Sequence, residues 1–172
     1  AALPVVLRAL VDVTDDGIVT GRAAPRELAA PNPDARRLVD AFIAARLLVA
    51  GTLGDAARIR VAHDALLSGW PRAAQAIAAD REALCTRGRA EAAAHRWLLE
   101  QRDPDFLLPP GRPLAEAAEL ATARPESLGA DAHAYVDASR QVDTARGEAA
   151  AALAQRELRL EAETQQARAD AA

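Results

Sequence analysis

The chain has 172 residues, enough for one well-packed core or two small ones and too few for a complete P-loop ATPase with a regulatory tail. All 21 basic residues are arginine, which excludes a Walker A lysine or a Schiff-base lysine within this stretch. With 25 acidic residues the net charge is −4, so neither the near-neutral first part (residues 1–72) nor the acidic remainder strongly attracts nucleic acid.

Composition predicts a mainly α-helical, cytoplasmic protein. Abundant Ala, Leu, Glu and Arg favour helix over sheet. Cys85 is the single cysteine, so we expect a buried thiol in a reducing compartment and no disulfide framework. No apolar run approaches the ~20 residues of a membrane span, and no signal-peptide pattern is present, so no membrane partner is expected. A chain that begins at Ala1 and lacks methionine is expected to be an internal segment of a longer protein.

The first third of the chain predicts a helix, a short strand and a second, brief helix. The first helix is predicted from apolar residues at helical spacing, namely Leu3, Val6, Leu7 and Leu10. A turn at 15–17 and a short strand at 18–20 follow. Pro25 can open a brief helix that runs through Ala29.

A third helix and a β-hairpin complete the pattern of a winged helix. Asn32 is suited to cap this helix and Pro33 to occupy its first position. Its buried stripe is predicted to consist of Leu38, Val39, Phe42 and Ile43. A strand at 47–49, a turn at 51–55 and a strand at 58–61 predict the hairpin. Helix, strand, helix, helix and hairpin wing is the element order of a winged helix.

The rest of the chain predicts helices. Asp64 is placed to cap a fourth helix, which Pro71 kinks or divides in two. Helices around Trp97 and after Pro113 precede a long helix that turns polar. We therefore expect a mainly α fold with three parts: a winged-helix domain (1–72), a helical arm or bundle (73–140) and a polar helical tail (141–172).

The most informative string runs from Ile59 to Arg72 and places the pair His63-Asp64 where a strand gives way to a helix. This corner resembles the sensor of STAND ATPases, in which a winged helix folds back on the nucleotide-binding core. In relatives such as plant resistance proteins and apoptosome proteins the corner reads Met-His-Asp. Here Ala62 stands at its first position.

Further segments resemble the bacterial novel STAND group, P-loop NTPases of the NACHT and NB-ARC kind. The match covers most of Leu3 to Arg140 and departs from the family at Pro109-Pro110. The segments that carry it are His63-Asp64-Ala65-Leu66, Trp70-Pro71-Arg72, Asp80-Arg81-Glu82, Arg102-Asp103-Pro104 with Leu107-Leu108, and Ala138-Ser139.

The resemblance implies a regulatory, non-catalytic segment of a signalling ATPase. His63 would contact the β-phosphate of ADP that another domain supplies, because an imidazole can donate to a phosphate oxygen. Asp64 would cap the helix and orient the corner. No catalytic residue, metal ligand or cofactor is expected in this segment, and ATP or ADP would belong to the parent protein. The implied partners are an adjacent P-loop NTPase domain and a C-terminal sensor, often WD repeats, in the same chain.

Two alternatives stay open at this point. A DNA-binding winged helix could present Arg36, Arg37 and Arg46 from its third helix and Arg58 and Arg60 from its wing. Against this, Arg36 and Arg37 are predicted to pair with carboxylates such as those of Asp34 and Asp40. A helical scaffold could instead form a homo-oligomer through the tail, where Leu153 and Leu160 are one heptad apart, too little for a coiled coil.

Other conspicuous residues are expected to be structural. His95 and His133 lack metal-ligand neighbours at suitable spacing and are predicted to lie on helix surfaces. Trp70 and Trp97 are expected to anchor cores, and the run Arg87–Glu91 to form a solvated face.

Overall fold

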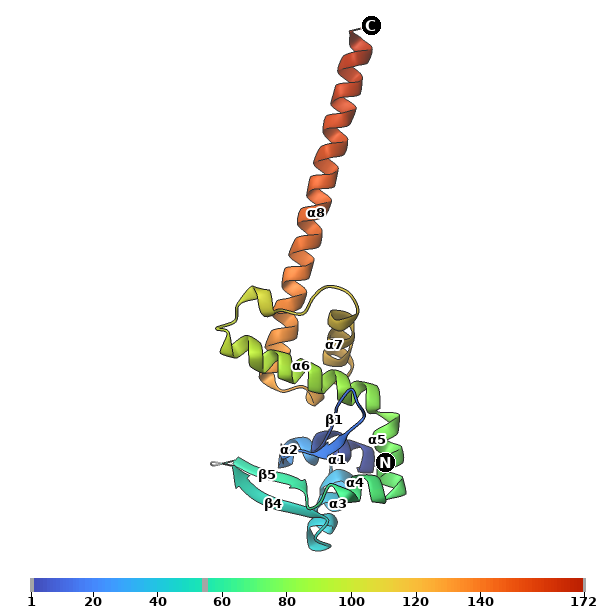
Figure 1. The fold of residues 1–172 in the computed structure, drawn as a ribbon, viewed down its shortest axis with the longest axis vertical. Helices are drawn as coiled ribbons and strands as arrows, with labels where there is room; N and C mark the ends of the chain where they lie inside the picture. The colour runs from blue at the N-terminus through green and yellow to red at the C-terminus, as the bar shows by residue number, and fades with distance from the viewer. Residues whose placement is uncertain (1, 54–55, 172) are drawn as a thin grey trace.

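A computed structural model describes residues 2–53 and 56–171, and its helices account for most of the described chain (Figure 1). The helices are α1 (Ala2–Leu10), α2 (Arg26–Ala29), α3 (Pro33–Ala44), α4 (Ala65–Gly69), α5 (Pro71–Ala79), α6 (Arg81–Leu99), α7 (Arg112–Ala123) and α8 (Ala130–Asp170), with 3-10 turns η1 (Pro104–Phe106) and η2 (Pro125–Ser127). The strands are β1 (Val11–Val13), β2 (Val19–Gly21), β3 (Ala24–Pro25), β4 (Leu48–Leu53) and β5 (Ala56–Val61). The prediction of a mainly helical chain is confirmed.

Local sequence signals account for where several helices begin. The side chain of Asn32 accepts a hydrogen bond from the backbone N–H of Ala35 at 2.9 Å, so the predicted cap of α3 is confirmed. Pro71 occupies the first turn of α5, where a missing N–H costs nothing, and it separates α4 from α5. The apolar face predicted for α1 is buried at Val6, Leu7 and Leu10.

Two small antiparallel sheets lie in the N-terminal part. β1 pairs with β2, and β5 lies between β3 and β4. Sequence patterns missed β1 and β3, which are only three and two residues long. The predicted turn at 51–55 is wrong for Gly51–Leu53, because cross-strand pairing with β5 continues through these residues. Residues 54 and 55 of that prediction lie outside the described residues.

Two hydrophobic cores lie one above the other, and α6 contributes to both. The first core joins α1, α3, the sheets, α4 and α5 around Leu10, Val39 and Ile59, and it includes Leu84 and Cys85 of α6. The second joins α6, α7 and the base of α8 around Trp97 and Tyr135, whose ring centroids are 5.6 Å apart. Because one helix crosses both cores, the part of the chain before residue 80 and the part after it are mechanically connected.

Arg87 corrects one expectation from the sequence. It was predicted on a solvated face, but only 3% of it is exposed. Its guanidinium donates to the carbonyl oxygens of Arg8 and Val11 and to the carboxylate of Asp12. A charged side chain is stable in such a place because acceptors from the end of α1 and the start of β1 surround it.

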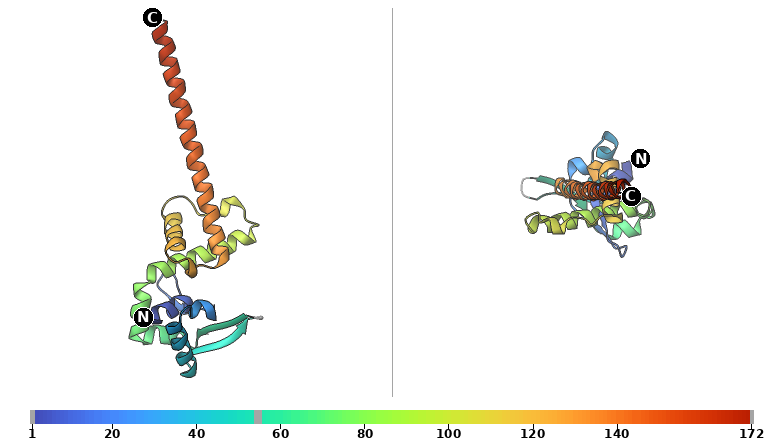
Figure 2. Two further views of the ribbon diagram at one scale, coloured as in Figure 1. Left: turned by 180° about the vertical axis from the view of Figure 1, so that it is seen from behind. Right: turned by 90° about the horizontal axis from the view of Figure 1, so that it is seen from above.

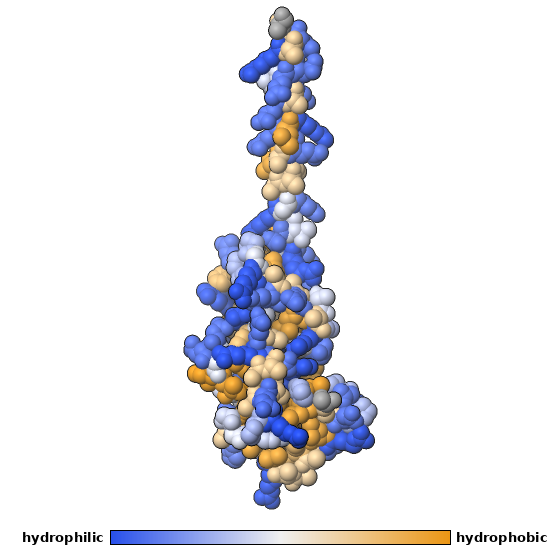
Figure 3. Space-filling view, turned by 90° about the vertical axis from the view of Figure 1, so that its right-hand side faces the viewer, coloured by the Kyte–Doolittle hydropathy of each residue, from blue (hydrophilic) through white to orange (hydrophobic). Residues whose placement is uncertain are grey.

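Helix α8 projects far beyond both cores (Figures 1 and 2). Its buried residues are confined to the base: Ala132, Tyr135, Val136 and Ser139. From Asp143 onward every described residue is exposed, and Figure 3 shows mostly polar side chains with apolar ones between them on the projecting part. Across the described residues, no helix combines the length and apolarity needed to cross a membrane.

Candidate functional site

The corner between β5 and α4 is fixed by burial on both of its sides. Val61 ends β5 with its side chain in the first core, and Leu67 returns the chain to that core from α4. Between them, the N–H of Ala62 donates to the carbonyl oxygen of Leu47 at 2.9 Å. The N–H of Leu66 then donates to the carbonyl oxygen of His63 at 3.0 Å. The backbone of the corner is thus held by hydrogen bonds before and after the histidine.

His63 lies at the surface of this corner. Its side chain is exposed, and within the described residues no hydrogen-bond or ion-pair partner is seen for its imidazole. The ring is therefore free of protein groups that would have to be displaced before it could donate to an external acceptor. It is not buried among aliphatic side chains, which would have ruled out contact with another domain.

Asp64 is tied to a neighbouring strand and does not cap its own helix. Its Oδ1 atom accepts a hydrogen bond from the backbone N–H of Gly21, at 3.0 Å, at the end of β2. The predicted side-chain cap of α4 is wrong, because Asp64 has right-handed helical backbone angles (φ −61°, ψ −25°) and makes no capping hydrogen bond. A capping residue usually has extended angles that aim its side chain at the first turn. The carboxylate instead joins the corner to β2.

Sequence reasoning missed Gly21, the partner of Asp64. A Cβ atom at this position would lie 2.8 Å from Asp64 Oδ1, closer than real Cβ contacts allow. A glycine inside a predicted strand is a recognised sign that something approaches the backbone closely. The strand predicted at 18–20 stopped one residue short of Gly21, which in the structure ends β2, so this signal did not apply, and the sequence could not say which residue approaches.

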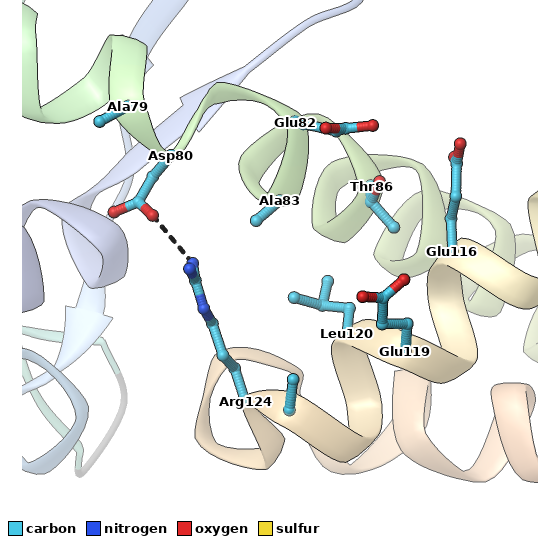
Figure 4. A pocket seen from close by; sticks show the side chains of 10 residues that line it. Ala79, Asp80, Glu82, Ala83, Thr86, Glu116, Glu119, Leu120 and Arg124 are labelled. Atoms are coloured by element: carbon cyan, nitrogen blue, oxygen red, sulfur yellow. Dashed lines mark hydrogen bonds and ion pairs between the residues drawn. The ribbon is translucent and has the colours of Figure 1, made fainter.

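An acidic groove of about 310 Å³ lies between α6 and α7. Figure 4 shows Glu82, Glu116 and Glu119 around it, with Asp80 paired to Arg124 at one end. Neither His63 nor Asp64 lines this groove. Carboxylates repel phosphate oxygens, so the groove does not suit a nucleotide.

The arginines considered for DNA contact are partly engaged with neighbours. Arg37 pairs with Asp34 as predicted, whereas Asp40 pairs with Arg26 of α2 and not with Arg36. Arg36 donates to the carbonyl oxygen of Ala30 at 3.3 Å. Carboxylates thus lie among the arginines of the exposed side of α3.

The two other histidines and the cysteine occupy the places expected of structural residues. His95 is exposed on α6, and a ring nitrogen of His133 lies 2.7 Å from the carbonyl oxygen of Pro125. Cys85 is buried and its thiol lies 3.5 Å from the carbonyl oxygen of Thr14. Among the described residues, no group of three or more potential ligands could hold a metal ion.

Comparison with known proteins gives one finding. The family described as novel STAND NTPase 1 matches residues 1–105, which include both sheets, the His63 corner and all of α6. No curated protein matches the chain, and no solved structure matches it.

Proposed function

Because the chain belongs to the novel STAND NTPase 1 family, we propose that it is the regulatory segment of a STAND-type signalling ATPase, in which His63 holds the ADP-bound closed state. The first core with its β4–β5 hairpin acts as a winged helix that docks on a P-loop domain of the same protein. The helical arm and α8 relay a signal from a C-terminal sensor, such as WD repeats. The segment itself is not an enzyme.

The observation that supports this role is the free imidazole at a fixed corner. A latch needs a donor that is positioned in advance and not already engaged, since an engaged donor gains nothing on docking. His63 meets both conditions within the described residues: its backbone is held on both sides and its ring is exposed. The acidic groove, by contrast, offers no surface for a phosphate.

The size of the effect suits a switch. A hydrogen bond to a charged group contributes roughly 1.5–3 kcal/mol, which corresponds to a shift of about 10- to 100-fold in an equilibrium between closed and open states. Loss of one such bond would bias the switch toward opening without abolishing nucleotide binding, because the P-loop domain would make the other phosphate contacts.

The test is nucleotide retention in the protein that contains this segment together with its P-loop domain. His63→Ala is expected to accelerate release of prebound ADP by at least about tenfold. His95→Ala, which removes an exposed histidine from α6, is the matched control and should leave the release rate unchanged. An unchanged release rate for His63→Ala would refute the latch.

DNA binding is the competing function, and charge is the observation that separates the two. A DNA-binding surface on α3 would have to work with Asp34 and Asp40 beside its arginines. Titration of the chain with duplex DNA at low and high salt decides between them. Genuine binding would weaken steeply with salt, whereas the regulatory role predicts no binding at either salt concentration.

A further inference from the structure

Among the described residues, the side chain of Asp64 ties the His63 corner to the end of β2. Gly21 and Arg22, at the end of this strand, contact the corner on one side and helix α6 on the other. We propose that the Gly21–Arg22 step is a joint that positions His63 and couples the corner to α6. The proposal rests on the latch role of His63 and identifies Gly21 and Arg22 as its positioning residues.

The contact from Gly21 to the corner is close enough that an added side chain would disturb it. The N–H of Gly21 donates to Asp64 Oδ1 at 3.0 Å, and a Cβ atom would lie 2.8 Å from that oxygen and 3.4 Å from Val61 Cβ. The backbone of Gly21 is outside the left-handed region, so a side chain here would meet the Asp64 carboxylate but would not strain the backbone. A larger residue would make the Asp64 carboxylate move, which weakens its hydrogen bond to the N–H of residue 21.

The contact from Arg22 to α6 is ionic. Its Nη1 atom lies 2.8 Å from Glu91 Oε2 of α6 and 3.3 Å from Asp12 Oδ1 of β1. Its backbone N–H donates to the carbonyl oxygen of Leu10 at 2.8 Å. Arg87, also on α6, binds the same Asp12 carboxylate at 2.8 Å. The end of β2 is therefore clamped between α6 and the junction of α1 with β1.

The contact with Asp64 and the contact with Glu91 are made by consecutive residues, Gly21 and Arg22, so only a short stretch of chain separates the corner from α6. A shift of α6 that moves Glu91 acts on the guanidinium of Arg22, and the planar peptide group joins the backbone of Arg22 to the Cα atom of Gly21. The Gly21 N–H then moves relative to Asp64 Oδ1, and a hydrogen bond weakens steeply as its geometry departs from the optimum. Rearrangement of the arm would thereby loosen the corner that carries His63.

The first experiment measures release of prebound ADP from the protein that contains the P-loop domain. Gly21→Ala and Glu91→Gln are each expected to accelerate release by roughly 3- to 30-fold, and neither should accelerate it further in a His63→Ala background. Gly51→Ala is the control for the added methyl, since nothing lies within 4 Å of a Cβ there. Glu82→Gln is the control for the lost charge on the same helix. Unchanged release in both test variants, with accelerated release in His63→Ala, would overturn the joint.

The second experiment uses the 172-residue chain alone, so that it does not depend on the latch role. Hydrogen exchange at the Gly21 amide should accelerate in Asp64→Ala and in Glu91→Gln, and stay near wild type in Asp64→Asn, whose side-chain oxygen still accepts. Backbone chemical shifts of His63 should move in Glu91→Gln and not in Glu82→Gln. If neither the chemical shifts nor the exchange rate responds to Glu91→Gln, the proposed role of Gly21 and Arg22 is wrong, even when His63→Ala accelerates ADP release.

Discussion

Arg87 and Asp80 join the two cores through single side chains. Arg87 reaches from α6 to one carbonyl oxygen near the end of α1 and one at the start of β1. Burial lowers the pKa of its guanidinium, the charge of Arg22 acts in the same direction, and the carboxylates of Asp12 and Glu91 oppose both. An arginine nevertheless stays charged at physiological pH. Asp80, between α5 and α6, binds Arg8 at 2.6 Å and Arg124 at 2.9 Å.

Replacing Arg87 by methionine, which has a similar apolar stem and no charge, should lower the free energy of unfolding by about 2–4 kcal/mol. The reason is that the carbonyl groups of Arg8 and Val11 would stay buried without a donor. Urea unfolding followed by circular dichroism measures the change. Arg72→Ala, at an exposed position, should change stability by less than about 0.5 kcal/mol. A loss equally small for Arg87→Met would contradict the hydrogen bonds described.

Asp80→Asn should destabilise the protein at neutral pH by about 2 kcal/mol and lose this effect in acid. Burial alone would raise the pKa of the Asp80 carboxyl, but the hydrogen bonds and charges of Arg8 and Arg124 outweigh it, so the pKa lies below its ordinary 3.8. The stability from these ion pairs is present above the unfolded pKa and is lost as pH falls through the lower folded pKa.

Urea titrations of wild type and Asp80→Asn at about pH 7, 5 and 3 measure this difference. The gap between the two proteins should be constant from pH 7 to 5 and should narrow toward pH 3. Glu119→Gln, which removes an exposed carboxylate from α7, is the control and should show little gap at any pH. A gap that persists undiminished into acid would indicate a packing effect, not a charge effect.

Among the elements, those with a clear apolar period were predictable and the short strands were not. The spacing of Leu3, Val6, Leu7 and Leu10 defines α1, and Asn32-Pro33 marks the start of α3. β1 is too short for an alternation to appear, and its edge is defined by contacts with α6, which is distant in sequence. The burial of Arg87 was unpredictable for the same reason: its acceptors lie more than 70 positions away in the chain.

The His63 corner was likewise predictable in one respect and not in another. The strand-to-helix placement of His63 follows from local patterns, because Val61 and Leu67 fix it. The role of Asp64 does not, since a carboxylate before a helix usually caps it. Only the approach of β2 in three dimensions directs Asp64 to Gly21.

Truncation of the chain after Arg146 should leave the stability of the rest nearly unchanged, with a midpoint of thermal unfolding within about 2 °C of the full chain. Every described residue removed is exposed, so no buried apolar area is lost. Tyr135→Phe is the contrasting variant. It removes the hydrogen bond from the Tyr135 hydroxyl to the carbonyl oxygen of Phe106, 3.0 Å long, and should cost about 1 kcal/mol. A large loss on truncation would show that the projecting helix supports the cores.

For the whole molecule, α6 and its ion pairs predict that the two cores unfold together. Each core contains one tryptophan, Trp70 in the first and Trp97 in the second, so Trp70→Phe and Trp97→Phe leave one reporter apiece. Urea unfolding of each variant is followed by fluorescence and by far-UV circular dichroism. The m-values from the two methods should agree within roughly 10–15%, and the two methods should give the same midpoint for each variant. Separate fluorescence and circular-dichroism midpoints in one variant would mean that the cores are independent domains.

The exposed part of α8, from Asp143 to Asp170, is long enough to act as a lever on the second core. At 1.5 Å of rise per residue this rod is about 40 Å long, so a tilt of about 10° at its base sweeps the tip through about 7 Å. Conversely, a force applied at the tip of α8 acts on Tyr135 and Val136 at its base through a long lever arm. A small force at the tip therefore exerts a large torque on the side chains packed around Trp97.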